Sequence, residues 1–242
     1  MAIYTGIADT NGDFIVPFSS AYAAGQKIIV TAEKDAATKT IELFAPSGVT
    51  GGGAIQFSGD LSSFPNNIGE ISLFDITGTI GNYCFFSTNA NEMWAKATGL
   101  HLPDGVTDIG FYSLYGWALA KVLTLPNTLK TIGNQSFSNW SSLLTLTIPN
   151  NVTTIGADAF YNCSSLTSLT IGSSVNYINA GAFGELSSCN EITCLATVPP
   201  TITSSTFQSL KSTCIFKVPA ASVNAYKAAS NWSAFAARIQ AI

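Results

Sequence analysis

Charge is scarce in this chain of 242 residues. Only 10% of its residues are Asp, Glu, Lys or Arg, against roughly 25% in an average globular domain. The net charge is −4, and His101 is the single histidine. Because no basic stripe is present, counterion release cannot drive binding to DNA or RNA, and we expect no nucleic-acid partner. The 47% share of hydrophobic residues also excludes the highly charged, apolar-poor kind of disorder.

Long apolar runs are missing too. No stretch approaches the roughly 18 apolar residues that cross a bilayer, so we expect no membrane insertion. Residues 1–6 contain no basic side chain, and no apolar segment typical of a secretory signal follows them. The sequence therefore predicts either a protein that does not use the general export route or one whose signal peptide has been removed.

Recognisable catalytic and metal-binding patterns are absent as well. The five cysteines are Cys84, Cys163, Cys189, Cys194 and Cys214. An odd number without C-x-x-C spacing favours neither a disulfide framework nor a zinc site. The histidine has no second histidine and no nucleophile motif beside it, and no paired-acid spacing stands out. We expect no catalytic residues, no metal and no cofactor, and hence a chain that is not an enzyme.

What the chain does contain is an internal repeat with a period of about 23 residues, a length typical of solenoid units. The segments 123–137, 146–160 and 169–183 align without gaps. Their anchor isoleucines continue in both directions as a series: Ile80, Ile109, Ile132, Ile155, Ile178 and Ile202. The step after Ile80 is longer than the others, and its extra length is expected to loop out around 89–96. Anchors at such regular spacing indicate a stacked repeat architecture.

Each unit has a clear physical interpretation. Leu146-Thr-Ile148 alternates apolar and polar residues, which predicts a short strand with its apolar side facing inward. Pro149 ends the strand, and two asparagines turn the chain. The second half places Phe160 between layers. One unit cannot bury its own apolar side, but stacked units share a continuous core. We therefore predict a mainly β fold with short helical or irregular segments, built as a solenoid.

The unit resembles that of the bacterial BspA-like leucine-rich repeat family, which reads roughly LxxLxLPxxLxxIGxxAFxxCxxL. The matching positions in one unit are Leu143, Leu146, Ile148, Pro149, Val152, Ile155, Gly156, Ala159, Phe160, Cys163 and Leu166. The resemblance implies a leucine-rich-repeat solenoid over 66–218, a helical cap over 219–242, and a surface-exposed binding or adhesion protein. Four cysteines, at 84, 163, 189 and 194, fall on core positions of this frame, which predicts buried structural thiols.

Residues 1–46 follow another pattern. Alternating apolar segments separated by turn signals predict a small antiparallel β module of roughly three or four strands. Glycines after residue 47 predict a flexible linker over 47–65. The segments 5–14 and 24–32 resemble bacterial immunoglobulin-like repeats and, more closely, modules that open some tailed-phage fibre and virion proteins. This resemblance implies attachment to a particle.

The outward row of the solenoid strands is the candidate binding surface. Leu146 and Ile148 face inward, so their neighbours at 145 and 147 face outward, and whole repeat steps continue the row. The candidate residues are Glu70, His101, Thr124, Thr145, Thr147, Ser168, Thr170, Glu191 and Thr193. Threonine is also simply a favoured solvent-facing strand residue, and the row lacks the Trp, Tyr and Arg of binding hot spots.

Aromatic side chains form an alternative candidate surface. Tyr112, Tyr115, Trp117 and Trp140 are its members. The two tryptophans share the repeat position of Cys163, which favours the core for them. Neither surface is singled out by the sequence alone.

Three functions compete. We favour a non-enzymatic virion protein of a tailed phage, such as a tail fibre, receptor-binding or capsid-decoration protein. Residues 1–46 would bind other virion proteins, and the solenoid a host surface protein or glycan; a homo-oligomer is compatible. The alternative is a bacterial cell-surface or secreted leucine-rich-repeat adhesion protein. A polysaccharide hydrolase ranks lower, because it needs a carboxylate pair in a cleft.

Overall fold

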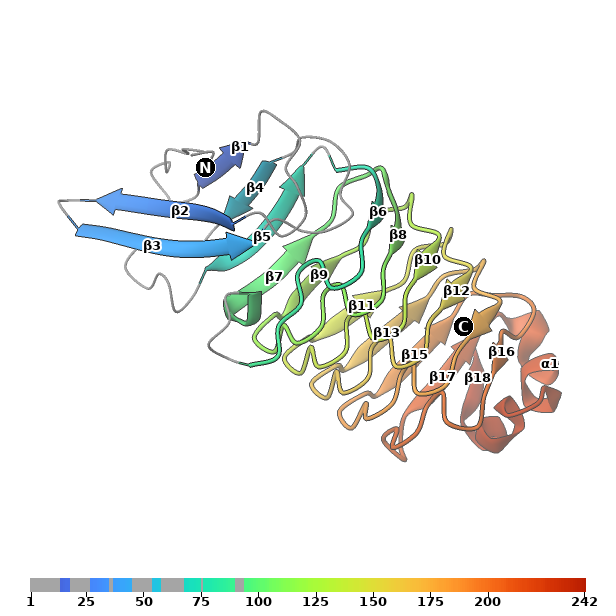
Figure 1. Cartoon of the computed structure of the whole chain (residues 1–242). Helices are drawn as coiled ribbons and strands as arrows, with labels where there is room; N and C mark the ends of the chain where they lie inside the picture. The colour runs from blue at the N-terminus through green and yellow to red at the C-terminus, as the bar shows by residue number, and fades with distance from the viewer. Residues whose placement is uncertain are drawn as a thin grey trace.

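The computed structural model describes residues 14–17, 27–34, 37–44, 54–57, 68–74, 76–89 and 94–242, and before residue 68 it describes the backbone alone. Its main body is a stack of coils that runs from the green to the red part of the chain in Figure 1. Each coil contributes one strand to each of two opposite sides of the stack. The strands form a single sheet on one side and two sheets on the other, and the core lies between the two sides.

The anchor isoleucines lie on the strands of a six-stranded sheet. Its strands, in spatial order, are β6 (Gly78–Ile80), β8 (Val106–Ile109), β10 (Thr131–Ile132), β12 (Thr154–Ile155), β14 (Tyr177–Ile178) and β16 (Thr201–Ile202). Ile109, Ile132 and Ile155 are direct partners across neighbouring strands, and the same register holds at both ends of the sheet. The predicted stack is therefore confirmed, including the two irregular steps that follow Ile80 and Ile178.

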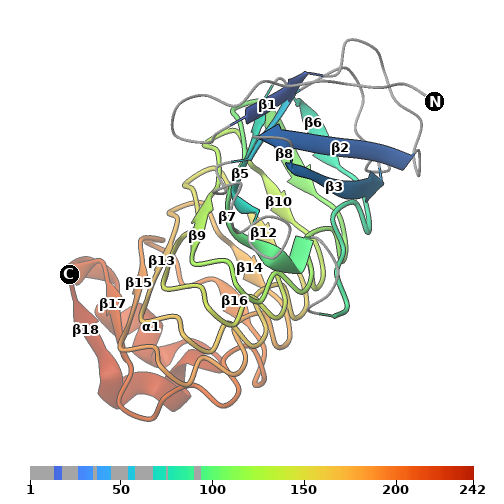
Figure 2. The same ribbon diagram turned by 90° about the vertical axis from the view of Figure 1, so that its left-hand side faces the viewer.

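The other strands form the opposite side, which we call the strand face. They are β5 (Gly69–Phe74), β7 (Ala97–His101), β9 (Val122–Thr124), β11 (Thr145–Thr147), β13 (Ser168–Ile171), β15 (Glu191–Cys194), β17 (Ile215–Val218) and β18 (Ile239–Ala241). They lie side by side in Figures 1 and 2, and the pairs with a described register are parallel. Their alternating burial follows the period of two that the sequence predicts.

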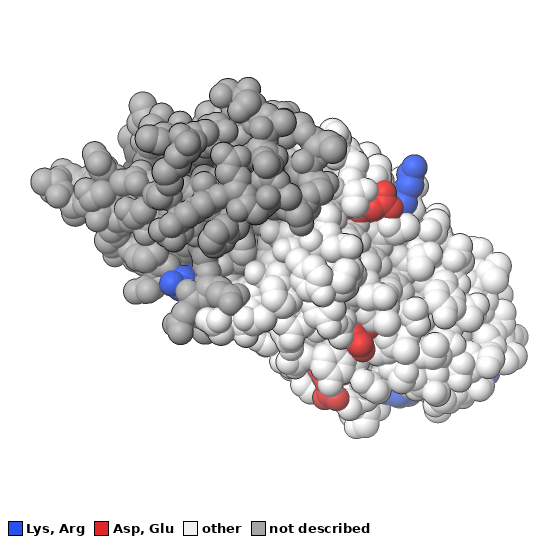
Figure 3. All heavy atoms as spheres, in the orientation of Figure 1, with Lys and Arg blue, Asp and Glu red and all other residues white. Residues whose placement is uncertain are grey.

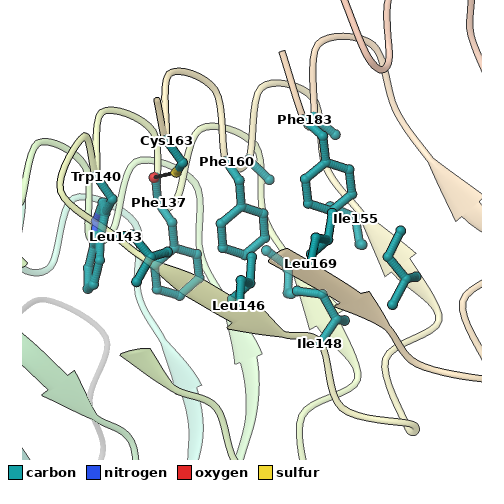
Figure 4. Packing of buried hydrophobic residues seen from close by; sticks show 14 of the residues in the cluster. Phe137, Trp140, Leu143, Leu146, Ile148, Ile155, Phe160, Cys163, Leu169 and Phe183 are labelled. Carbon is teal, nitrogen blue, oxygen red and sulfur yellow. Dashed lines mark hydrogen bonds between the residues drawn. The ribbon is translucent and has the colours of Figure 1, made fainter. Parts of the chain in front are cut away.

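Stacked aromatic rings fill the interior. Phe137, Phe160 and Phe183 stack with centroids 5.0 and 5.6 Å apart, because one repeat step places each ring over the next. Figure 4 shows this column beside the strand leucines and isoleucines. All three rings are fully buried. Full burial of such a side chain is worth about 1.5–3 kcal/mol, so the interior shared by the coils stabilises the stack.

The two ends of the stack are closed differently. At the N-terminal end, β4 (Ala54–Phe57) pairs antiparallel with β5 and with β1 (Phe14–Pro17). The linker expected over 47–65 therefore contains a paired strand, which corrects that expectation. β2 (Lys27–Lys34) and β3 (Ala37–Phe44) form an antiparallel pair. This agrees with antiparallel strands in the first 46 residues, while the turn signals expected between them lie outside the described residues.

The C-terminal end is closed by η2 (Ala220–Ser222), α1 (Val223–Ala228), η3 (Trp232–Arg238) and the final strand β18. Trp232 is buried, and its indole Nε1 donates to Pro200 O at 2.7 Å. The Tyr226 hydroxyl donates to Ala196 O at 2.8 Å. The expected cap over 219–242 is thus helical only in part, because its last residues return as a strand beside β17. At the other end, the 3₁₀ helix η1 (Trp94–Lys96) falls in the loop expected around 89–96.

Candidate binding surfaces

The predicted row lies on the strand face in the predicted register. Thr145 pairs with Ser168, and Ser168 with Glu191. Thr147, Thr170 and Thr193 form the parallel series two residues further along. These side chains are exposed or half-buried, so they form a ladder of short hydroxyl groups open to solvent.

The N-terminal end of the row is a hydrogen-bonded chain of three groups. His101 Nε2 lies 2.7 Å from Glu70 Oε2, and His101 Nδ1 lies 2.9 Å from Thr124 Oγ1. A hydroxyl, an imidazole and a carboxylate in this order are the connectivity of a catalytic triad. Here they stand on an open sheet, where the His101 and Glu70 side chains are 35% and 43% exposed. Water therefore reaches all three groups, and the arrangement favours mutual pairing over nucleophilic catalysis.

The other end of the row is also paired internally. Glu191 Oε2 lies 2.8 Å from Lys217 Nζ, and the Thr193 hydroxyl donates to Glu191 Oε1 at 3.2 Å. Lys217 was not among the predicted residues, although its position opposite Thr193 on β17 follows from extending the row by one strand. Exposed ion pairs of this kind contribute about 0–1 kcal/mol. Glu70 and Glu191, the two carboxylates of the row, are thus both paired with neighbouring side chains, which weakens the case for the row as the main contact surface.

A second surface is richer in the residue types of binding sites. Five aromatic side chains meet there, and we call them the aromatic cluster: Tyr83, Phe86, Phe111, Tyr112 and Tyr115. Tyr83 stacks on Tyr112 with centroids 5.4 Å apart, and Phe86 stacks on Tyr115 at 5.3 Å. Tyr83 is 51% exposed, and the other four rings are half-buried.

The repeat itself shows that these rings are not needed for folding. One repeat step further along the chain, the positions of Phe111, Tyr112 and Tyr115 hold Asn134, Gln135 and Ser138. Tyr112 and Gln135 even share a left-handed backbone with φ of 54°. Because the same coil geometry forms with small or polar side chains, the aromatic residues are an addition to the surface and not part of the required core.

Charge plays little part in this surface. The segments 76–89 and 109–120, which carry the aromatic cluster, contain no Asp, Glu, Lys or Arg. In Figure 3, charged side chains are sparse over the described part of the molecule. Tyr112 and Tyr115 belong to the alternative candidate surface predicted from the sequence, and both are partly exposed. Tyr83, Phe86 and Phe111 were missed, although the excess of aromatic residues in the first two coils was the available signal.

The remaining candidates belong to the interior. Trp117 and Trp140 are fully buried, as the repeat position predicted. The four cysteines assigned to core positions are buried free thiols, and so is Cys214. Burial raises the pKa of the Cys163 thiol to about 12, which keeps that group neutral. Among the residues that the structure describes, no three His, Cys, Asp or Glu side chains lie together as metal ligands. No helix in the same ranges is long and apolar enough to cross a membrane.

Comparison with known proteins agrees with the fold and the repeat unit. The sequence profile described as BspA type leucine rich repeat region matches residues 79–214 in six copies, which is more than half of the chain. The chain belongs to the BspA-type leucine-rich repeat family. A search among curated protein sequences gave no match. The match begins after the N-terminal strands, so the immunoglobulin-like attachment module stays a prediction.

Solved structures of other leucine-rich repeat proteins are similar to this chain, and one of them, PcpA, shows the shared fold. The pneumococcal vaccine antigen PcpA is 22% identical with a TM-score of 0.56, and the match covers 88% of this chain and 48% of PcpA. The leucine-rich repeat protein of T. pallidum is 18% identical with a TM-score of 0.46, over 62% of this chain and 77% of that protein. A leucine-rich repeat protein from Eubacterium ventriosum is 16% identical with a TM-score of 0.41, over 72% of this chain and 53% of that one. The BspA-type chain described here therefore spans about half the length of PcpA.

Proposed function

We propose that this chain is a non-enzymatic recognition protein on the surface of a bacterial cell or secreted from it, and that the side of its solenoid binds a protein or glycan of another surface. The aromatic cluster carries the proposal. Three half-buried rings, those of Phe111, Tyr112 and Tyr115, lie at positions where the next coil has polar or small side chains, which points to selection for contact. Tyrosine is enriched in binding hot spots, because it supplies a large area at a small entropy cost.

The family supports this location better than a virion. Surface-exposed binding and adhesion proteins are what the BspA-type resemblance implies, and the profile covers the coils that carry the aromatic cluster. The virion role rested on the resemblance of the first 46 residues, which lie outside the part of the chain that the family profile matches. Binding to other virion proteins through residues 1–46 and a homo-oligomeric state have no support here.

A transplant of neighbouring residues tests the proposal. The triple variant Phe111→Asn, Tyr112→Gln, Tyr115→Ser gives one coil the surface of the next coil, so it is expected to fold. Beads coated with either protein would be applied to epithelial cells, immobilised matrix proteins and an oligosaccharide array. Removing several aromatic contacts is expected to weaken binding at least about 30-fold, the equivalent of one hot spot of about 2 kcal/mol.

The strand face supplies the matched control. The double variant Thr147→Lys, Thr170→Lys places two long cations on the predicted row, between its paired ends. If the aromatic cluster is the contact surface, this variant binds like the unmodified protein. Loss of binding in the lysine variant alone would assign the function to the strand face instead. Equal binding by all three proteins would reject both surfaces.

A further inference from the structure

Tyr83 is held by three neighbouring rings and still keeps much of its surface open. Its ring stacks on Tyr112 with centroids 5.4 Å apart and planes 11° from parallel. The rings of Phe86 and Phe111 meet it at 84° and 70°, with centroids 5.4 and 4.6 Å away. Tyr83 nevertheless remains 51% exposed, which makes it the most exposed ring of the aromatic cluster. The contacts thus fix the ring in place and leave an aromatic surface for a ligand.

An asparagine side chain with a fixed orientation lies beside the rings. Asn134 is exposed, and its backbone oxygen accepts from Tyr112 N at 3.0 Å. Its side-chain Oδ1 accepts from Ala157 N at 2.8 Å. Since that oxygen faces a backbone N–H, the NH₂ group of the same amide points the other way. The cluster is therefore bordered by an oriented hydrogen-bond donor.

The coils around the cluster carry little charge. The segments 76–89, 109–120 and 131–157 of three successive coils contain no Asp, Glu, Lys or Arg. The first charged residue after them is Asp158, whose Oδ2 accepts from Gln135 Nε2 at 3.4 Å. Protein interfaces often use charged groups for steering, and their hot spots are rich in arginine. A sulfated or sialylated glycan would need cations at the contact. The local chemistry therefore favours a ligand without charge.

A pyranose ring without charged substituents matches this chemistry. One face of such a ring presents polarised C–H groups, which are attracted to the negative face of an aromatic ring. Its hydroxyl groups both donate and accept hydrogen bonds, and amide and phenol groups offer both functions without a net charge. Apolar contact combined with a few oriented polar groups is also the usual composition of a ligand site.

We propose that the aromatic cluster binds an uncharged oligosaccharide, with one pyranose ring on Tyr83 and a further sugar within hydrogen-bond reach of the Asn134 amide. Coils of the stack follow one another at the spacing of neighbouring strands, about 4.8 Å. This step is close to the length of one sugar residue in an extended chain. A short oligosaccharide along the stack therefore reaches from the coil of Tyr83 to the coil of Asn134. This ligand class rests on the proposed function, since it is the ligand of the same surface.

Treatment of the target surface tests the ligand class. Beads coated with the full chain would be applied to epithelial cells that are untreated, oxidised with periodate, or treated with sialidase. Periodate cleaves the vicinal diols of sugars, whereas sialidase removes a charged sugar and leaves the neutral ones. The triple variant Phe111→Asn, Tyr112→Gln, Tyr115→Ser defines the part of the binding that depends on the cluster. We expect periodate to reduce this part at least about tenfold and sialidase to leave it unchanged. Because no ion pair forms, 0.5 M salt should change it less than about twofold.

A pair of matched variants tests the hydrogen bond to the ligand. Asn134→Asp keeps an oxygen for Ala157 N but removes the amide donor and adds a charge. Asn150→Asp is the control, because Asn150 Oδ1 accepts from Ser173 N at 3.0 Å in a turn outside the cluster. We expect Asn134→Asp to weaken the cluster-dependent binding about three- to tenfold, as the loss of one hydrogen bond implies. Asn150→Asp should bind like the unmodified protein.

The possible failures differ in what they reject. Cluster-dependent binding that survives periodate would overturn the glycan ligand and leave the recognition function standing, since a protein would then be bound. Loss of binding after sialidase alone, or several-fold weakening in 0.5 M salt, would overturn the uncharged ligand. Equal binding by Asn134→Asp and the unmodified protein would overturn the contact with that amide. Equal capture of the triple variant and the unmodified protein would instead reject the function of the cluster, and its ligand with it.

Discussion

Trp117 and Trp140 stack face to face, with ring centroids 5.3 Å apart and planes 4° from parallel, although they belong to successive coils of the chain. Each indole also reaches into an earlier coil. Trp117 Nε1 donates to Phe85 O at 2.8 Å, and Trp140 Nε1 donates to Leu114 O at 2.6 Å. Both tryptophans therefore join coils twice, by ring contact and by a buried hydrogen bond.

Removing the indole N–H should separate these two contributions. Trp140→Phe keeps an aromatic ring but leaves the buried Leu114 carbonyl without its donor. We expect the free energy of unfolding to fall by about 1–3 kcal/mol, the cost of an unsatisfied buried group, in addition to the loss of ring area. Urea unfolding followed by circular dichroism measures the change. Tyr177→Phe, at an exposed position of β14, is the control, and it should change stability by less than about 0.5 kcal/mol.

Two glycines with similar backbones should respond differently to alanine. Gly116 and Gly78 have φ of 84° and 78°, a conformation that side chains rarely adopt. A Cβ at Gly78 would meet nothing within 4 Å, whereas one at Gly116 would lie 2.0 Å from Ser87 O. We expect Gly78→Ala to cost about 1–2 kcal/mol from backbone strain alone. Gly116→Ala should cost clearly more, because the coil carrying Ser87 must move. Equal Tm values for the two variants would contradict this.

The stack could be predicted from the sequence because the constant spacing of the repeat shows which residues of neighbouring coils lie side by side. Once Ile132, Ile155 and Ile178 recur at one spacing, alternation along each strand decides which side chains face inward. The same rule placed Thr147 and Thr170 next to each other on the outer row. What it did not reveal were contacts that depend on side-chain reach. The hydrogen bond between His101 and Glu70 is an example, because it joins positions that are offset by two residues between neighbouring strands.

The ends of the solenoid were harder to predict for a related reason. The repeat rule stops there, and the chain must satisfy sheet edges by other means. β4 pairs antiparallel with β5 within a range that read as linker because of its glycines. β18 forms from the short segment Ile239–Ala241, which carries no repeat signature, and is held by pairing with β17. Tertiary pairing thus overrides weak local signals at both ends.

Stability should fall in alkaline solution through the buried thiols. The pKa of Cys163 is about 12 in the folded chain, above the value near 8.5 of an unfolded thiol. The stabilising effect of its neutral form is fully present below pH 8.5 or so and is lost as pH rises toward about 12. Between these values the free energy of unfolding should fall less steeply in Cys163→Ala, by up to about 1.4 kcal/mol per pH unit. Denaturant titrations under reducing conditions at several alkaline pH values measure both slopes. Identical slopes would contradict the expectation.

The C-terminal cap should depend on one guanidinium group. Arg238 Nη1 lies 3.0 Å from Lys211 O, 3.1 Å from Ser212 O and 3.2 Å from Cys214 O. Its guanidinium also lies 5.0 Å from the centre of the Phe235 ring. Arg238→Ala should lower the free energy of unfolding by about 1.5–3 kcal/mol, the range for hydrogen bonds to a charged group. Arg238→Lys should restore little, because a single ammonium lacks the planar fork. Faster proteolysis after Lys217 would show that loosening begins at the cap.

The constant length of the repeat step also governs how such a chain can change in length. Since Phe137, Phe160 and Phe183 occupy equivalent places, removal of one whole step brings the outer two rings into the same stacked contact. Duplication of a step inserts one more ring into the column. One whole coil can therefore replace another without disturbing the stack. Recombination between coils can lengthen or shorten the molecule while the aromatic cluster near one end and the cap at the other stay intact.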